Sequence, residues 1–177
     1  TLDPRDVRSG VGEILKVHAI DGPGSFADLA ADYDRLFSEP DLMMRYVRRA
    51  LEIKKAYIED DEFDRGPRNI FNYGHTFGHA IEAATDFAIP HGIAVTIGMD
   101  MANFVSSRIG DGTEDHFRRL HPTLASNYDG FESHPVPFDR FLAAILKDKK
   151  NTGTGSVTMI LPGADCRLSK VTHAADD

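Results

Sequence analysis

The sequence predicts a mainly α-helical fold with one short strand near the C-terminus. Residues 40–58 and 75–87 carry apolar side chains three or four positions apart, the spacing of an amphipathic helix. GSVTMILP, at residues 155–162, is the one stretch that indicates a strand. No glycine-rich fingerprint follows a strand and opens a helix, as dinucleotide binding would require. We therefore expect residues 1–177 to form a single helical domain.

The first part of the chain predicts helices separated by short turns. Residues 10–20 read as a helix that the turn DGPGS, at 21–25, ends. After a short helical stretch, Pro40 opens a long amphipathic helix with Asp41 as its N-cap. The apolar ladder of this helix comprises Leu42, Tyr46, Val47, Ala50, Leu51, Ile53 and Ile58.

The middle of the chain predicts two helices with a proline between them. An acidic loop at 60–67 precedes a helix at about 75–87, and Pro90 breaks the chain before a helix that Gly110 ends. One face of the first helix carries a polar stripe of His75, His79, Glu82 and Asp86, and another an apolar stripe of Phe77, Ile81, Ala84 and Ala88. In the second helix we expect burial of Ile93, Ile97, Met101, Phe104 and Val105.

The last part is predicted to be less regular. An acidic segment with Pro122, Pro135 and Pro137 leads to a final helix from Phe138 to Lys147, and the strand follows.

The composition is that of a globular protein and excludes several classes of function. Apolar residues make up 41% of the chain and charged residues 27%, and the net charge of −8 provides no basic field for nucleic acid or anionic lipid. We expect no signal peptide, and no apolar run approaches the roughly 20 residues that span a bilayer. Cys166 is the single cysteine, so no intrachain disulfide can form. We expect a cytoplasmic protein without nucleic-acid or membrane partners.

Three histidines lie within seventeen positions and predict a metal site. His75 and His79 are spaced to chelate one ion from a single helical face, and His91 can join them where Pro90 turns the chain back. A catalytic zinc site commonly takes three His or carboxylate ligands and keeps one position open. The candidate carboxylates are Glu13, Glu82 and Asp86. The flanking glycines Gly74, Gly78 and Gly92, which cost helix stability, favour function over an ordinary polar face, but spacing leaves open which two histidines bind.

Several basic residues lie beside apolar positions rather than in a solvated run. In an acidic protein they could converge on a phosphate or carboxylate, although for any one of them taken alone a surface position is the better interpretation. They are Lys16, Lys54, Arg68, Lys149 and Lys150.

Three other features read as ordinary structure. GTGS, at 153–156, is followed by a strand instead of a helix, which favours a tight turn over a phosphate cradle. DDEFD, at 60–64, lacks the spacing of a calcium loop and reads as a solvated loop. No base lies near Cys166 in the sequence to make it a nucleophile.

Five motifs together resemble the C-terminal domain of 3-dehydroquinate synthase and its sugar-phosphate cyclase relatives. The resemblance runs in order from residue 1 to about 163. The motifs are GVGEILK at 10–16, EIKKAYIEDDE at 52–62, RNIFNYGHTFGHAIE at 68–82, HGIAVTIGM at 91–99 and KDKKNTG at 147–153.

The resemblance implies roles for individual residues. It assigns the metal ligands to Glu13, His75 and His91, with zinc or cobalt as the ion, and makes His79 a substrate-contacting histidine. The residues that would hold the substrate's carboxylate and phosphate are Lys16, Lys54, Arg68, Asn72 and one of Lys149 or Lys150. Among these, the catalytic residues would be His79, Lys16 and Asn72.

The resemblance also implies a reaction and a missing partner. In this family NAD transiently oxidises a ring alcohol, phosphate is eliminated, the ketone is reduced again and an aldol step closes the carbocycle. Most NAD contacts come from an N-terminal Rossmann-like domain, which we expect to be absent from this chain. We therefore expect these residues alone to bind NAD weakly and to be inactive, with a homodimer expected by analogy.

The family residues that the motifs retain indicate which substrate is expected. Asn72 and His79 are retained, which favours 3-deoxy-arabino-heptulosonate 7-phosphate as substrate and 3-dehydroquinate as product. Ile93 and Phe71 replace the family's usual Glu and Leu, and the residues after Pro162 depart from its usual ending. A sister cyclase of the 2-deoxy-scyllo-inosose or valiolone type therefore stays open, as does a non-catalytic domain that binds metal or a partner.

Overall fold

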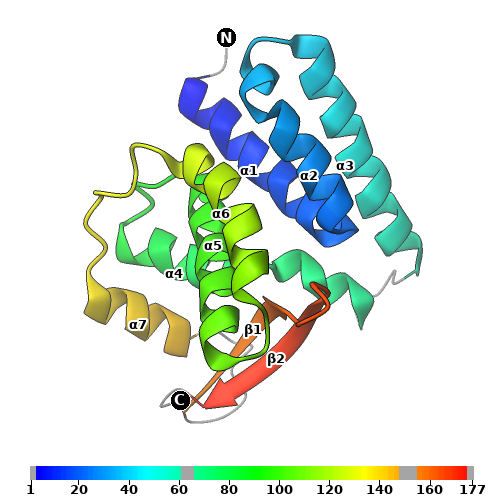
Figure 1. Ribbon diagram of the computed structural model, residues 1–177. Helices are drawn as coiled ribbons and strands as arrows, with labels where there is room; N and C mark the ends of the chain where they lie inside the picture. Colours follow the sequence, from blue (N-terminus) through cyan, green and yellow to red (C-terminus); the bar gives the residue numbers. More distant parts are fainter. Residues whose placement is uncertain (1–2, 61–65, 148–154, 175–177) are drawn as a thin grey trace.

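The computed structural model describes residues 3–60, 66–147 and 155–174 and is mainly helical, as the sequence predicts (Figure 1). The elements in chain order are α1 (Pro4–Asp21), α2 (Pro23–Asp32), the 3₁₀ helix η1 (Tyr33–Phe37), α3 (Pro40–Asp60), the 3₁₀ helix η2 (Pro67–Asn72), α4 (His75–Ala84), α5 (His91–Ile109), α6 (Glu114–Tyr128), α7 (Phe138–Leu146), β1 (Ser156–Pro162) and β2 (Leu168–Ala174).

Helix α5 is the centre of the packing. It contacts α1, α4, α6 and β1, and Figure 1 shows it between these elements. Ile93, Val95 and Met99 are completely buried although they lie on different sides of the helix. Of the five residues expected to be buried, Ile93 is; Phe104 is 43% exposed, so the prediction is wrong there, and Ile97, Met101 and Val105 are only partly buried.

Glycines bring the backbones of α1, α4 and α5 into direct contact. A Cβ on Gly12 of α1 would collide with the carbonyl oxygen of Gly92 and lie 2.5 Å from Thr96 Oγ1. A Cβ on Gly98 of α5 would collide with the carbonyl oxygen of Gly74 and lie 2.8 Å from the backbone nitrogen of Gly78. Larger residues at these positions would push the three helices apart.

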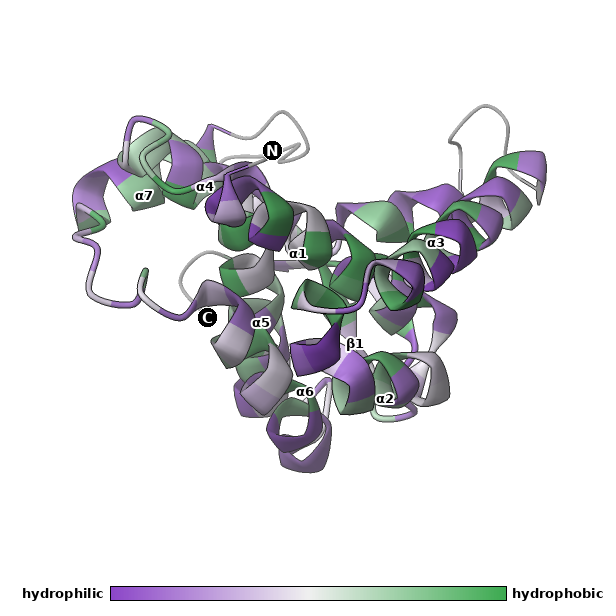
Figure 2. Cartoon of the chain, turned by 90° about the horizontal axis from the view of Figure 1, so that it is seen from above, coloured by the Kyte–Doolittle hydropathy of each residue, from purple (hydrophilic) through white to green (hydrophobic). Residues whose placement is uncertain are grey.

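Helix α3 lies on the opposite side of the molecule from α4 and α7, with α1 between them (Figure 2). Pro40 is its first residue, so Asp41 lies inside the first turn instead of capping it. A carboxylate there still stabilises the helix through the partial positive charge of its N-terminus. Leu51, a member of the apolar ladder, is 61% exposed.

Helix α4 ends three residues before the predicted boundary. It stops at Ala84, and Asp86 and Phe87 have positive φ angles of 51° and 60°, which a helix cannot continue through. Asp86 and Ala88 therefore leave the predicted polar and apolar stripes. Asp86 instead accepts a hydrogen bond of 2.9 Å from Arg140 of α7.

Helix α6 includes Pro122, where the sequence indicates an irregular segment. Thr113 caps the helix by accepting a hydrogen bond of 3.1 Å from the backbone nitrogen of His116. Leu120 and Leu124 are buried against the core. This packing outweighs the hydrogen bond that the proline removes.

The C-terminal residues form a hairpin in which β1 is the predicted strand. Its antiparallel partner β2, paired from Ser156↔Ala174 to Pro162↔Leu168, was not predicted, because the polar sequence LSKVTHA lacks an apolar run. Thr76 Oγ1 of α4 donates to the Thr158 carbonyl at 3.2 Å, which ties β1 to the helices. Across the described residues, no helix has the length and apolar character to cross a membrane.

Substitution at two glycines of α1 tests the close contact between α1 and α5. Gly12→Ala should lower the free energy of unfolding by about 1–3 kcal/mol, because the new Cβ overlaps Gly92. Gly10→Ala is the matched control: its Cβ would meet nothing within 4 Å, and it should stabilise the helix by up to about 1 kcal/mol. Urea-induced unfolding measures both. Equal stability of the two variants would show that the helices can separate without cost.

Candidate metal and substrate site

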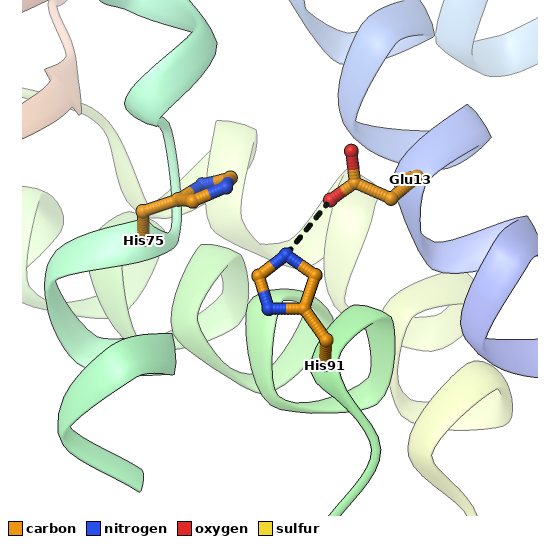
Figure 3. Close-up of side chains that lie close together, drawn as sticks. All are labelled: Glu13, His75 and His91. Atoms are coloured by element: carbon orange, nitrogen blue, oxygen red, sulfur yellow. Dashed lines mark ion pairs between the residues drawn. The ribbon is translucent and has the colours of Figure 1, made fainter. Parts of the chain in front are cut away.

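Glu13, His75 and His91 converge from three helices (Figure 3). Glu13 lies in the middle of α1, and His75 and His91 are the first residues of α4 and α5. The structure places one ligand atom from each residue within 4.8 Å of the others, and His91 Nε2 lies 3.7 Å from Glu13 Oε1. Two imidazoles and one carboxylate form a donor set that suits zinc and other divalent transition metals.

The glycine contacts between helices explain this convergence. The Gly12–Gly92 contact lies beside Glu13 and His91, and the Gly74–Gly98 contact lies beside His75. Because backbones meet backbones at these points, the helix starts approach closely enough for side chains to share one ion.

His75 is held as a neutral imidazole with one nitrogen available. Its Nδ1 donates to the Tyr73 carbonyl oxygen at 3.1 Å, which leaves the lone pair of Nε2 for a ligand. Burial, followed by the positive charge of Lys16, lowers the pKa of His75 to about 4. The side chain is therefore uncharged near neutral pH, as a metal ligand must be.

Lys16 and Glu13 form an ion pair beside the histidines. Lys16 is only 3% exposed, and its Nζ lies 2.9 and 3.1 Å from the two Glu13 oxygens. Burial lowers the pKa of Lys16, against the opposing effect of Glu13. For Glu13, burial acts to raise the pKa, but Lys16, helped by His75 and Lys54, outweighs it and the net shift is downward. The carboxylate is thus kept in the charged form that binds metal.

A second group of ligand atoms overlaps the first. His79, Glu82 and His91 also lie within 4.8 Å of one another, and the ring centroids of His75 and His79 are 5.0 Å apart. His79 is exposed one helical turn from His75. Among the candidate carboxylates, Asp86 is excluded, because it lies outside α4 and pairs with Arg140.

The predicted basic residues are brought together only in part. Lys16 is in the site, and Lys54 lies close enough to act on the pKa values of Glu13 and Lys16. Lys54 and Glu13 both line a groove of about 140 Å³ between α1 and α3. Arg68 and Asn72 lie on η2, which contacts α1 and α3, and Asn72 Nδ2 donates to the Asn69 carbonyl at 3.1 Å.

The remaining predicted features lie elsewhere or outside the described residues. Lys149, Lys150, most of the 60–64 run and the beginning of the GTGS turn fall outside them. Cys166 lies between β1 and β2, where Arg119 donates to its sulfur at 3.3 Å.

Two supporting contacts were missed by sequence reasoning. The Tyr73 carbonyl fixes His75, and Glu82 contacts His91 Nδ1 at 3.1 Å, where the sequence indicated only a candidate metal ligand. A backbone carbonyl leaves no signal in a sequence. The polar stripe did carry a signal for Glu82, because it showed a carboxylate on the histidine-bearing face.

The chain matches a protein family over most of its length. The sequence model described as 3-dehydroquinate synthase C-terminal matches residues 10–151. The 3-dehydroquinate synthase of Rhizobium meliloti (strain 1021) is 36% identical over 172 residues, covering 91% of this chain and 45% of the relative. That of an Exiguobacterium species is 38% identical over 169 residues, covering 91% and 44%. The chain thus spans less than half the length of these curated relatives.

Solved structures of sugar-phosphate cyclases share the fold. One is 2-deoxy-scyllo-inosose synthase complexed with carbaglucose-6-phosphate, NAD⁺ and Co²⁺, with a TM-score of 0.81 at 22% identity over 99% of this chain and 51% of that one. Another is 2-epi-5-epi-valiolone synthase from Streptomyces hygroscopicus subsp. jinggangensis 5008 with NAD⁺ and Zn²⁺ bound, with a TM-score of 0.79 at 25% identity over 98% and 49%. The resemblance seen in the motifs is confirmed, and the chain belongs to the 3-dehydroquinate synthase family as its C-terminal domain.

Proposed function

We propose that this chain is the metal- and substrate-binding half of an enzyme that converts 3-deoxy-arabino-heptulosonate 7-phosphate to 3-dehydroquinate with loss of phosphate. The observation that carries the proposal is the convergence of Glu13, His75 and His91 in a member of this family. The curated relatives, at 36% and 38% identity, favour this substrate over those of the cyclases at 22% and 25%.

The donor set fits a divalent ion, for which zinc or cobalt is the proposed identity. Glu13 supplies a carboxylate that Lys16 keeps ionised, and His75 supplies an imidazole that is already neutral. His91 directs its Nε2 to the same point. An ion held there would act as a Lewis acid toward a hydroxyl or carbonyl oxygen of the substrate.

The surrounding residues would bind and orient an anionic substrate. Buried Lys16 and half-buried Lys54 provide positive charge beside the site, and Arg68 and Asn72 would add directional donors from η2. His79, exposed one turn from His75, can hold or move a proton near the substrate's reacting oxygens. One of Lys149 or Lys150 would complete the phosphate contacts.

The redox part of the reaction would be supplied from outside this chain. NAD, bound mostly by a separate Rossmann-like domain, would provide the transient oxidation and reduction. We propose that residues 1–177 form one helical domain that binds NAD weakly and is inactive without that partner. Tight NAD binding by these residues would overturn this division of roles.

Elemental analysis of the purified chain beside two variants tests the metal ligands. The wild type should contain one equivalent of zinc or cobalt, His91→Ala should lose it and His79→Ala should keep it. The reverse pattern would assign the metal to the helical chelate of His75 and His79. A metal-free wild type would contradict the proposed centre.

The full-length protein, containing the NAD-binding half, tests the substrate. Phosphate release should be observed with 3-deoxy-arabino-heptulosonate 7-phosphate and not with glucose 6-phosphate or sedoheptulose 7-phosphate. Turnover of either of the latter would assign a sister cyclase. No turnover of any of the three by metal-loaded protein would favour a non-catalytic domain.

The pKa of His75 predicts how the metal-free chain responds to acid. A folded pKa of about 4 against 6.5 for the free side chain means that the unfolded chain binds the proton more tightly. Neutral His75 therefore contributes to the free energy of unfolding. The contribution is complete above pH 6.5 and is lost as the pH falls toward 4, by up to about 3 kcal/mol. Urea unfolding with EDTA at pH 7 and pH 4.5 should show a smaller loss for His75→Asn than for the wild type. Equal losses would show that His75 titrates normally.

A further inference from the structure

The His91 ring lies between two carboxylates that come from different helices. Its Nδ1 is 3.1 Å from Glu82 Oε1 of α4, and its Nε2 is 3.7 Å from Glu13 Oε1 of α1. The ring itself belongs to α5. The two nitrogens of an imidazole are not equivalent, because the neutral ring carries one proton and one lone pair. Which nitrogen carries the proton decides where the ring can bind an ion.

Glu82 determines which nitrogen of His91 carries the proton, because its carboxylate is buried and can only accept. Its side chain is 9% exposed, and a buried carboxylate requires hydrogen-bond donors. An ionised carboxylate can only accept, so the contact requires the proton of His91 to be on Nδ1. In the neutral form of the ring, which is the form that binds metal, the lone pair is then on Nε2, the nitrogen that faces Glu13.

The backbone around Glu82 keeps the carboxylate in place. Glu82 lies two residues before the end of α4, where Phe87 donates to its carbonyl oxygen at 2.8 Å. Gly78, one turn earlier, packs against the backbone of Val95, with atoms 3.1 Å from the position of an added Cβ. Helix α4 therefore provides both His75 and the residue that orients His91, and its contact with α5 sets their relative positions.

This arrangement distinguishes the two overlapping groups of ligand atoms. His79, Glu82 and His91 would bind an ion only if His91 turned its lone pair toward Glu82, and a neutral ring cannot offer a lone pair on both sides. The hydrogen bond with Glu82 favours the group with Glu13 and His75. A carboxylate that holds the far nitrogen of a metal-binding histidine also makes the ring a stronger ligand.

We propose that Glu82 is a positioning residue of the metal centre, which fixes His91 with its Nε2 lone pair toward Glu13 and His75. The inference rests on the proposed function, because it assumes that these three residues bind the ion. In this arrangement Glu82 positions the metal ligand His91 and is not itself a metal ligand.

The proton position can be measured without metal. Long-range ¹⁵N–¹H NMR spectra of the chain in EDTA should show the His91 proton on Nδ1. In Glu82→Leu the proton should shift toward Nε2, because the acceptor is gone. A wild-type His91 protonated on Nε2, or a tautomer unchanged in Glu82→Leu, would overturn the inference.

Metal affinity then measures the effect on the site. Titration with Zn²⁺ and Co²⁺ should show affinity reduced about 10–100-fold in Glu82→Leu, the usual effect of losing such a contact. Glu82→Gln should lose less metal affinity than Glu82→Leu, because the amide oxygen still accepts from Nδ1–H of His91. The visible spectrum of bound Co²⁺ should keep the wild-type band pattern in Glu82→Gln, since the ligands are unchanged. Because Gln has nearly the shape of Glu, this variant remains informative if Glu82→Leu fails to fold.

Asp100→Asn is the matched control. Asp100 is a second buried carboxylate, 8% exposed, whose Oδ2 accepts from His121 Nδ1 at 2.8 Å and from the Tyr128 hydroxyl at 2.7 Å. Its histidine belongs to neither group of ligand atoms, so Asp100→Asn should leave metal affinity unchanged. An equal loss of metal affinity in Asp100→Asn would show that the effect of the Glu82 substitution is general destabilisation, and it would overturn the inference.

The remaining outcomes separate this inference from the proposed function. Wild-type affinity in Glu82→Leu would overturn the inference alone. Complete loss of metal in Glu82→Gln, with a changed Co²⁺ spectrum in any residual complex, would make Glu82 a ligand and also overturn it. A wild-type chain that binds neither ion would overturn the proposed centre and this inference together.

Discussion

The direct contact of helix backbones through glycine is the constraint on which the site depends. Glu13, His75 and His91 are carried by three different helices, so their convergence requires α1 and α4 to lie unusually close to α5. Gly12 and Gly98 allow this, because any side chain there would overlap the neighbouring backbone. Glycine inside a helix costs about 1 kcal/mol relative to alanine. Glycine is nevertheless present at the points where the helices must meet.

Charge is arranged around the site before any ligand arrives. Buried Lys16 donates to partly buried Glu13, and buried Glu82 accepts from His91, so each of these two carboxylates has a hydrogen-bond donor. Such pairs contribute little to stability once their desolvation is counted, but breaking one leaves a buried charge unpaired. Their value therefore lies in holding side chains in the geometry that a metal or an anionic substrate needs.

The sequence predicted the helical class and most helix positions, and the resemblance of its motifs named Glu13, His75 and His91, but neither showed how these three residues meet. The spacing of His75 and His79 indicated a chelate within one helix, whereas the structure also brings Glu13 from α1, which periodicity cannot reveal. Pro122 was misjudged because packing of α6 overrides a local helix breaker, and Phe104 because the apolar spacing of α5 did not show that this side chain is exposed. Strand β2 was missed because a partner strand, and not its own composition, stabilises it.

His75 and His91 are each the first residue of a helix, and this has an electrostatic consequence. The aligned peptide dipoles of α4 and α5 place roughly half a positive charge at each helix start, so both fields add at the same point. The protein as a whole carries −8, yet here the local potential is shifted toward positive values by the backbone itself. That contribution does not depend on protonation and cannot be removed by mutating a side chain. An oxygen that gains negative charge at this point would be stabilised at any pH at which the helices stay folded.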